Sequence, residues 1–347
     1  MRGASYDLKT GKRFWWVAAP GLIEWREKMK TLKCMMYTLL ASLPLATGAV
    51  MADAEQGYER IFVFGASITD PGNRFAVTRR TAHPPFDPIE YDPYGVGGHR
   101  STNGRTWVEV MADGMNLTEG GKPAYRDPAF GNYAYSYARA REVDISDGPS
   151  LGDQVQAWID NGYCSTVPMY DTLFVLDTVW ADLKDILLGE EPDDVLPGMV
   201  DSFVTNIGIL YACGARNLMV AYTPPMGVFP GVPADFKVEA NYLSAMYNYD
   251  LVQAVVDGYS SVMNISTVDF FAFTTVVMAT PDLFGFTNIE DSCVTPGVVK
   301  KAFCQYRNGY FFWDALHPTK TAHAVMGRYA LKHLPDPDAV IVPMALP

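Results

Sequence analysis

The chain has 347 residues, of which 49% are hydrophobic, 13% are aromatic and only 19% are charged. This composition supplies enough apolar surface for one large core, and it excludes a disordered chain or a coiled coil. Residues 53–347 hold 19 Lys and Arg against 36 Asp and Glu, a formal charge of −17, and the whole chain carries −12. A body this acidic has no basic surface for nucleic acid and is repelled by anionic membranes, so we expect neither as a partner.

The N-terminal region has the pattern of a leader. Residues 29–33 are basic, residues 35–47 are mostly apolar, and the small residue Ala52 follows as a site for cleavage. This three-part pattern is typical of a secretory signal peptide. The apolar run is shorter than the roughly 20 residues that cross a bilayer, so we expect no stable membrane span; an anchor or a buried helix is the alternative. We predict a leader over residues 1–52, a single domain over 53–347, and a secreted or periplasmic protein.

Apolar runs alternate with amphipathic stretches from residue 59 onward. The runs predict buried strands at residues 61–64, 172–176, 218–222 and 266–270. The amphipathic stretches predict helices at residues 106–115, 151–160, 194–213, 240–259 and 318–333. Residues 76–104 are rich in Pro, Gly, His and Tyr without periodicity and predict a long loop. Strands that alternate with helices form a parallel sheet covered on both faces, so the predicted fold class is α/β, a three-layer α/β/α sandwich with a central parallel sheet.

Four of the five cysteines follow the leader, and an even number in an exported protein permits two disulfides. Cys293 and Cys304 flank a short loop and are the first pair we expect. Four buried free thiols, with Cys164 and Cys213 as the other two, are the alternative. No CxxC or HExxH spacing occurs, so the sequence predicts no metal site.

The sequence GASITD (residues 65–70) follows the first predicted strand. Reactive groups in an open parallel sheet collect at the carboxyl ends of the strands, and the small residues Gly65 and Ala66 let the chain turn sharply there. Ser67 would then lie near a helix start, with its backbone N–H directed at a site where it can stabilise an oxyanion. The alternative is that Ser67 merely caps a helix.

The second candidate segment is DALHPT (residues 314–319), in which an acid and a histidine lie three positions apart in a turn fixed by Pro318. Asp314 can hold one imidazole nitrogen of His317 while the other nitrogen takes a proton from Ser67. The alternative is a helix start at which both side chains are merely solvated. We expect the remaining histidines in loops or at the surface: His83, His99, His323 and His333.

Taken in order, these segments resemble the GDSL/SGNH esterases and lipases over nearly all of residues 59–335. FVFGASITDPGN (62–73) resembles the family block that carries the nucleophile, and DALHPT the block that carries the acid and the base. STNGRTW (101–107) resembles the block whose glycine, here Gly104, gives an oxyanion-hole N–H. The resemblance implies an SGNH-hydrolase-like, flavodoxin-like domain with Ser67, Asp314 and His317 as its catalytic triad, and with the N–H groups of Ser67 and Gly104 in the oxyanion hole.

The chain departs from the family pattern at three positions. Ala66 stands where the family usually has Asp, and Val179 stands where it has Gly. Ala181 takes the place of the Asn whose side-chain amide completes the oxyanion hole. The loss of one such donor costs about 10²- to 10³-fold in rate.

The resemblance implies a serine esterase or lipase that hydrolyses lipid or short-chain acyl esters, with a small-molecule or lipid ester as substrate and with no cofactor or metal. The gap at Ala181 leaves open a weakened or inactive SGNH-fold protein that binds an acyl or glycan ligand. A carbohydrate deacetylase on the same scaffold is the third hypothesis. Trp180 either lines an acyl pocket or packs in the core.

Overall fold

The computed structural model describes residues 57–79, 94–143, 148–166, 169–177, 180–294 and 303–336, together with two short N-terminal strands. β1 (Gly3–Tyr6) and β2 (Arg13–Trp16) pair antiparallel, with Gly3 opposite Trp16. Contacts divide the chain into two units, Met1–Glu55 and Gln56–Pro347. The cleavage site expected at Ala52 lies outside the described residues, so the leader and the single domain over 53–347 remain predictions.

The second unit is built on a parallel four-stranded sheet. Its strands follow the chain in spatial order: β3 (Arg60–Phe64), β4 (Thr172–Asp177), β5 (Asn217–Ala221) and β6 (Asn264–Val268). All four predicted strands are confirmed, but the fourth ends at Val268 and not at Phe270. The side chain of Asp269 accepts the N–H of Ala272 at 2.8 Å and so starts helix α9 (Phe270–Ala279) where the strand was expected to continue.

An irregular segment, residues 131–135, lies along the free edge of β3. The N–H of Val63 donates to the Gly131 carbonyl at 3.0 Å, and the N–H of Tyr133 donates to the Val63 carbonyl at 2.7 Å. After β3 the chain therefore runs first to one side of that strand and later, as β4, to the other. Open α/β sheets bind ligands at such a reversal, beyond the carboxyl ends of the strands.

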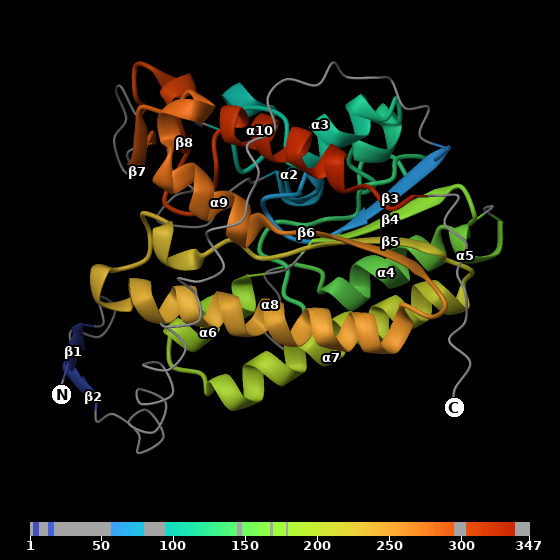
Figure 1. Cartoon of the computed structure of the whole chain (residues 1–347), viewed down its shortest axis with the longest axis horizontal. Coiled ribbons are helices and arrows are strands. Elements are labelled where there is room, and N and C mark those ends of the chain that lie inside the picture. The colour runs from blue at the N-terminus through green and yellow to red at the C-terminus, as the bar shows by residue number, and fades with distance from the viewer. Residues whose placement is uncertain are drawn as a thin grey trace. The chain divides into compact units, whose positions relative to one another are not determined.

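Helices cover both faces of the sheet (Figure 1). One layer contains α2 (Asn73–Thr78), α3 (Trp107–Gly114), α9 and α10 (Lys320–Ala330). The other contains α4 (Leu151–Asp160), α5 (Tyr163–Thr166), α6 (Ala181–Leu187), α7 (Pro192–Ala212) and α8 (Lys237–Tyr259). A separate parallel pair, β7 (Asn288–Ser292) and β8 (Tyr310–Phe312), lies beside α9 and α10. The predicted three-layer α/β sandwich is confirmed.

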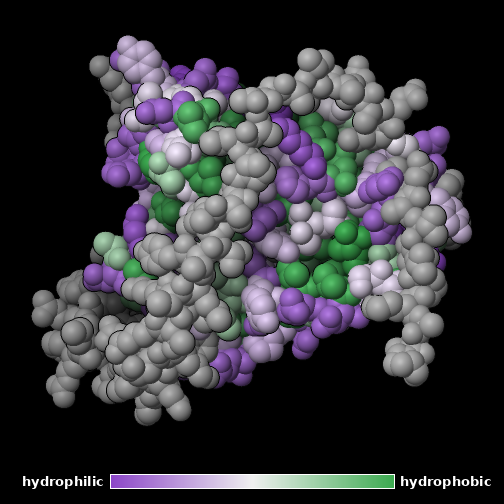
Figure 2. All heavy atoms as spheres, viewed as in Figure 1, coloured by the Kyte–Doolittle hydropathy of each residue, from purple (hydrophilic) through white to green (hydrophobic). Residues whose placement is uncertain are grey.

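The core lies between these layers. All six residues of β4 are buried. On one face of the sheet, Trp158 packs edge-on against Phe62 and Phe174, with ring centroids 5.5 and 5.6 Å apart. In the other layer, Trp107 packs against Phe270 at 5.0 Å. Figure 2 shows hydrophilic residues over the outer helix surfaces and hydrophobic residues where the layers meet.

The predicted helices are present, with small shifts at their ends. The last one begins at Lys320 and not at Pro318, because the Thr319 side chain caps it by accepting the N–H of Ala322 at 3.3 Å. The stretch predicted as a loop over 76–104 contains the end of α2 and a single 3₁₀ turn at Gly95–Gly97, and residues 80–93 lie outside the described part.

Both permitted disulfides are formed. Cys164–Cys213 joins α5 to the residue that follows α7, and Cys293–Cys304 closes the short loop between β7 and β8 as expected. The alternative of four free thiols is therefore wrong.

Among the described residues, one helix is long and apolar enough to cross a membrane. This is α7, with 21 residues and a mean hydropathy of 1.3 over its best window. Of that window, 44% is buried inside the protein, and core helices pass the same test, so the helix is weak evidence for a span.

Candidate active site

Ser67 lies in a tight turn directly after β3, at the carboxyl end of the sheet. The N–H groups of Thr69 and Asp70 both donate to the Ala66 carbonyl, at 3.0 and 2.9 Å, and fold the chain back on itself. The following helix, α2, begins only at Asn73, with Gly72 at its N-cap position. Ser67 therefore caps no helix, and the helix start that we expected beside it lies further along the chain.

Gly65 allows this turn to form against the neighbouring strand. A Cβ atom at Gly65 would lie 2.6 Å from the Cβ of Asp177 at the end of β4, so a larger residue does not fit. Gln154 of α4 satisfies both polar groups of Gly65: its Oε1 accepts the N–H at 2.9 Å, and its Nε2 donates to the carbonyl at 3.0 Å. The base of the turn is thus fixed by a helix and a strand.

Asp70 fixes the other end of the turn. Its carboxylate accepts the N–H groups of Gly72 and Asn73 at 2.8 and 2.5 Å. It also accepts the N–H and the hydroxyl of Ser136, each at 2.8 Å. Because Ser136 follows the edge segment 131–135, these bonds tie the turn of Ser67 to the strand edge beside it.

Asp314 and His317 lie side by side in the turn between β8 and α10. Nδ1 of His317 is 2.8 Å from both carboxylate oxygens of Asp314. The N–H groups of Leu316 and His317 donate to Oδ1 at 2.8 Å, and the hydroxyl of Tyr94 donates to Oδ2 at 2.7 Å. Asp314 is 5% exposed and His317 is 4% exposed, so the alternative in which both are solvated is wrong.

The surroundings of Asp314 keep it ionised. Burial disfavours the charged carboxylate, but His317, Tyr94 and the N–H of Leu316 outweigh burial and hold the pKa of Asp314 below its ordinary value. A charged acid beside Nδ1 favours a proton on that nitrogen and leaves Nε2 able to accept one.

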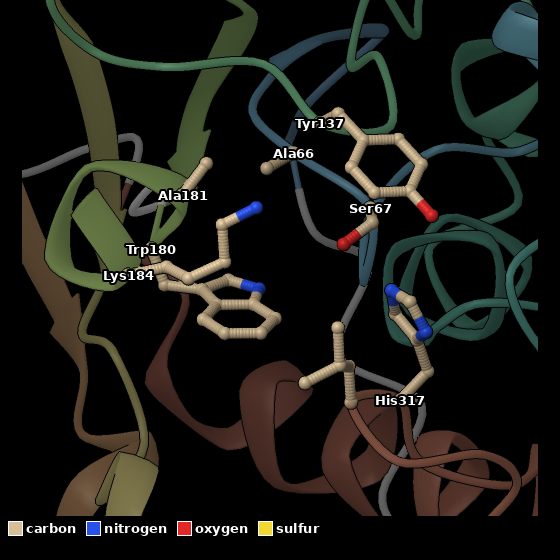
Figure 3. Close-up of a pocket in the computed structure, with 8 residues that line it drawn as sticks. Ala66, Ser67, Tyr137, Trp180, Ala181, Lys184 and His317 are labelled. Carbon is tan, nitrogen blue, oxygen red and sulfur yellow. The ribbon is translucent and has the colours of Figure 1, made fainter. Parts of the chain in front are cut away.

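Ser67 and His317 line one pocket at the carboxyl edge of the sheet. Figure 3 shows the second ring nitrogen of His317 pointing toward the Ser67 hydroxyl, with Trp180 and Lys184 across the pocket from the imidazole. The pocket holds about 330 Å³ of empty space, including its open mouth. Its lining comes from four separate stretches of the chain: Ala66, Ser67, Tyr137, Trp180, Ala181, Lys184, Leu316 and His317.

The positions expected to form the oxyanion hole have different surroundings. Among the described residues, none accepts a hydrogen bond from the N–H of Ser67 or of Gly104. Gly104 packs against the start of α10, where a Cβ would lie 2.6 Å from the Cβ of Lys320, and it is not among the described residues that line the pocket. Ala181, the first residue of α6, does line the pocket, with a methyl group that cannot donate. Val179 lies outside the described residues.

A buried network of ion pairs holds α6 beside the pocket. Arg139 binds Asp185 through two nitrogens, at 2.7 and 2.9 Å, and Nε of Arg141 lies 2.8 Å from Oδ1 of Asp182. Burial raises the pKa of Asp182 above its ordinary value, although Arg141 acts in the opposite direction. The start of α6 is therefore fixed to the segment 139–141, which follows the edge segment.

Sequence patterns missed three residues of the site: Tyr94, Tyr137 and Lys184. Tyr137 has a φ of 70°, in the left-handed region that a bulky residue rarely adopts, and its ring lies 4.6 Å from the guanidinium carbon of Arg74. Of these three, only Lys184 could have been found from the sequence, because it lies one helical turn after Ala181, at which the chain departs from the family pattern.

His323, which we expected in a loop or at the surface, is buried in α10. Its Nδ1 accepts the N–H of Trp107 at 3.2 Å. Burial, with His317 nearby, lowers the pKa of His323 to about 3. His99 stacks on Phe75, and His83 lies outside the described residues.

The pocket contains the kinds of side chain that acyl transfer uses. Its polar groups are two hydroxyls, one imidazole, one ammonium and one indole N–H, whereas metal sites need several carboxylate, imidazole or thiolate ligands. The part of the chain that the structure describes contains no group of three or more His, Cys, Asp or Glu that could hold a metal ion.

Two curated relatives and two solved structures illustrate what the chain is similar to. A GDSL esterase/lipase of Arabidopsis thaliana is 24% identical over 353 residues, which cover 87% of this chain and 98% of that protein. The anther-specific proline-rich protein APG of the same plant is 28% identical, over 78% of this chain and 60% of that protein.

Among solved structures, a lipolytic G-D-S-L family protein from Veillonella parvula has a TM-score of 0.41 at 19% identity and covers 79% of this chain and 96% of that chain. The acetylxylan esterase Axe2 from Geobacillus stearothermophilus has a TM-score of 0.43 at 13% identity, over 84% and 100%. The sequence model of the GDSL-like Lipase/Acylhydrolase family matches residues 61–330. This match spans most of the chain, and the protein therefore belongs to the GDSL-like lipase/acylhydrolase family of ester hydrolases.

Proposed function

We propose that this protein hydrolyses carboxylic esters through an acyl-enzyme formed on Ser67, with His317 as general base and Asp314 as the residue that orients His317. The observation that carries the proposal is the shared pocket. The imidazole faces the Ser67 hydroxyl there, while its other nitrogen is held 2.8 Å from the carboxylate. Membership of a family of ester hydrolases supports the reaction class.

The reaction runs in two halves. First, Nε2 of His317 takes the hydroxyl proton while Oγ of Ser67 bonds to the carbonyl carbon, whose oxygen becomes an oxyanion. The bond to the alkoxy oxygen then breaks, and the alcohol leaves with the proton from Nε2. In the second half, water loses a proton to Nε2 and attacks the acyl carbon, the bond to Oγ breaks, and the carboxylic acid leaves while Ser67 regains its proton. Asp314 stabilises the imidazolium that forms in each half.

The backbone N–H groups of Ser67 and Gly104 are the proposed donors to the oxyanion. Ser67 lines the pocket, and its N–H donates to no described residue; both observations support its role as a donor to the oxyanion. The part of Gly104 rests on the family resemblance and on an N–H that no described residue accepts.

The lining of the pocket supports a lipid or short-chain acyl ester as substrate. Trp180, Tyr137 and Leu316 give the pocket apolar walls.

The proposal is tested by labelling the purified protein with a fluorophosphonate probe and mapping the modified residue. We expect modification at Ser67 and turnover of p-nitrophenyl esters that depends on chain length. Ser67→Ala should abolish both, whereas Ser260→Ala, at an exposed serine after α8, should change neither.

Four outcomes would contradict the proposal or its substrate class. Labelling of a different residue, or full turnover by Ser67→Ala, would remove Ser67 from the reaction. Turnover confined to acetylated sugars would indicate a carbohydrate deacetylase. Binding of esters without any turnover would indicate an inactive binding protein.

We also propose that the protein is secreted or periplasmic, with residues 53–347 as the mature hydrolase domain. The two disulfides support this, because such bonds persist in oxidising compartments and are rare in the cytosol.

A further inference from the structure

We propose that the side-chain ammonium of Lys184 donates a hydrogen bond to the oxyanion and so replaces the amide that is missing at Ala181. This inference rests on the proposed function. It assigns a catalytic role to a residue one helical turn away from the position where the family carries its donor.

The geometry of α6 brings both residues to the same pocket. Ala181 and Lys184 lie three positions apart, so their side chains leave the same face of the helix. Both line the pocket with Ser67. In Figure 3 the amine of Lys184 extends beyond the short side chain of Ala181, toward the side of the pocket where Ser67 lies and opposite His317.

The ammonium is not committed to a structural ion pair. Within the described residues, nothing forms a hydrogen bond or an ion pair with it. The acidic residues next to it on α6 are already bound, Asp182 by Arg141 and Asp185 by Arg139. In a domain where acids greatly outnumber bases, a lysine left unpaired and turned into a pocket is available for a negative charge in that pocket.

The base of the lysine is rigid while its end can adjust. The ion pairs of Asp182 and Asp185 fix α6 on both sides of Lys184, and Trp180, just before the helix, stacks on Phe229 with ring centroids 5.9 Å apart. A flexible four-carbon stem with three donors can then follow the carbonyl oxygen as it becomes tetrahedral.

The proposed contact acts mainly in the transition state. The ester carbonyl is neutral when it binds and carries a full negative charge once Oγ of Ser67 has bonded to it. A charge-assisted hydrogen bond from an ammonium is about twice as strong as a neutral one, and it gains most when the charge appears. Its loss should therefore lower kcat far more than it raises KM.

The test compares four proteins on neutral p-nitrophenyl esters: wild type, Lys184→Met, Lys184→Arg and the double variant Lys184→Met/Ala181→Asn. We expect Lys184→Met to lower kcat by about 10²-fold or more with little change in KM. Lys184→Arg should retain more activity than Lys184→Met, and the double variant should recover part of the loss. Lys122→Met, at an exposed lysine paired with Glu119, is the charge-matched control and should behave as wild type.

A binding measurement keeps the test independent of turnover. A small alkyl boronic acid adds to an activated serine and becomes a tetrahedral anion, so its affinity reports on the oxyanion site without any leaving group. We expect about 10²-fold weaker binding to Lys184→Met than to wild type. Circular dichroism and the unfolding midpoint check that the variant is folded.

The outcomes separate this inference from the proposed function. Wild-type kcat and wild-type boronate affinity in folded Lys184→Met would overturn the role of Lys184 and leave Ser67 in place. A rise in KM confined to esters with an anionic group, with unchanged kcat on neutral esters, would show that Lys184 binds substrate charge instead. Absence of turnover and of boronate binding in wild type would overturn the proposed function, and this inference with it.

Discussion

Tyr94 shows how a residue outside the proposed triad can fix the geometry of two of its members. It lies at the start of the 3₁₀ turn Gly95–Gly97, within a small apolar cluster that also contains Cys293 and Trp313. From there its hydroxyl reaches Oδ2 of Asp314 at 2.7 Å. The carboxylate is thus held on one oxygen by backbone N–H groups and on the other by Tyr94, and it cannot rotate away from His317.

Replacing this tyrosine should weaken catalysis without weakening substrate binding. We expect Tyr94→Phe to lower kcat about tenfold or more, because a hydrogen bond to a charged group contributes about 1.5–3 kcal/mol. KM should stay within about twofold, since the hydroxyl contacts Asp314 and not the pocket. Steady-state kinetics on a neutral ester measure both, with Tyr306→Phe at an exposed tyrosine as the control. An equal loss in both variants would argue against a positioning role for Tyr94.

Sequence reasoning at this scale found the residues that lie in short local motifs. Asp314 and His317 could be paired because only three positions in a turn separate them. Ser67 could be found because it lies in the turn that follows a strand. Tyr94 could not be found, because its partner lies 220 positions away and only the folded chain brings them together. Lys184 was missed for a related reason, since its role depends on which face of α6 meets the pocket.

At the scale of elements, the apolar runs were sufficient to locate the four strands of the sheet. They failed for α9, whose sequence FFAFTTVVMA is apolar on all sides and shows no helical period. They also failed for α6, which has only seven residues and is held by ion pairs and not by an amphipathic pattern. The local cap at Asp269 ends β6 and starts α9, whereas ion pairs with Arg139 and Arg141, which no local pattern records, fix the start of α6.

The ion pairs of α6 lead to a prediction about stability. Arg141→Met leaves the carboxylate of Asp182, whose side chain is fully buried, with a backbone N–H as its remaining donor among the described residues. Breaking a buried pair from one side costs about 3–5 kcal/mol. We expect a loss of that size in the free energy of unfolding, measured by urea denaturation. Kinetics below the unfolding transition should show reduced kcat, because α6 carries Ala181 and Lys184.

An exposed pair supplies the contrast for this measurement. Lys122 and Glu119 are both largely exposed, and such pairs contribute less than about 1 kcal/mol. Lys122→Met should therefore change the free energy of unfolding only slightly. If Arg141→Met lowered the free energy of unfolding no more than Lys122→Met does, the ion pairs would not hold α6 in place.

At the scale of the whole molecule, the reversal of the chain at β3 positions the site. Three stretches, after β3, after the edge segment and after β4, end at the same rim and supply Ser67, Tyr137 and Ala181 to one pocket. The fold class followed from the alternation of strands and helices. The reversal at β3 could not be predicted from the sequence. Residues 131–135 pair with β3 through a few hydrogen bonds and lack the apolar run that marks a strand.

The stability of the whole molecule should depend on pH through His323. Its ordinary pKa is 6.5, and burial lowers the pKa to about 3 in the folded protein. Between these values the unfolded chain binds a proton that the folded chain does not, so stability falls as pH drops through this window. The slope is at most one proton, or about 1.4 kcal/mol per pH unit.

Replacing His323 should remove that slope. We expect the free energy of unfolding of His323→Gln to decrease less than that of wild type as pH is lowered from about 7 to about 4 in urea titrations. His333→Gln, near the end of α10, is the control and should follow wild type. A constant difference between His323→Gln and wild type at every pH would show that the buried ring does not exclude its proton.

The proposed nucleophile and base lie far apart in the sequence, Ser67 after the strand β3 and His317 just before the helix α10. A ribosome adds about 5–20 residues per second, so the serine is made roughly 10 to 50 seconds before the imidazole. Through all of that time the growing polypeptide has a hydroxyl without a base. Ester hydrolysis by this proposed pair therefore cannot begin before residue 317 has been added to the chain.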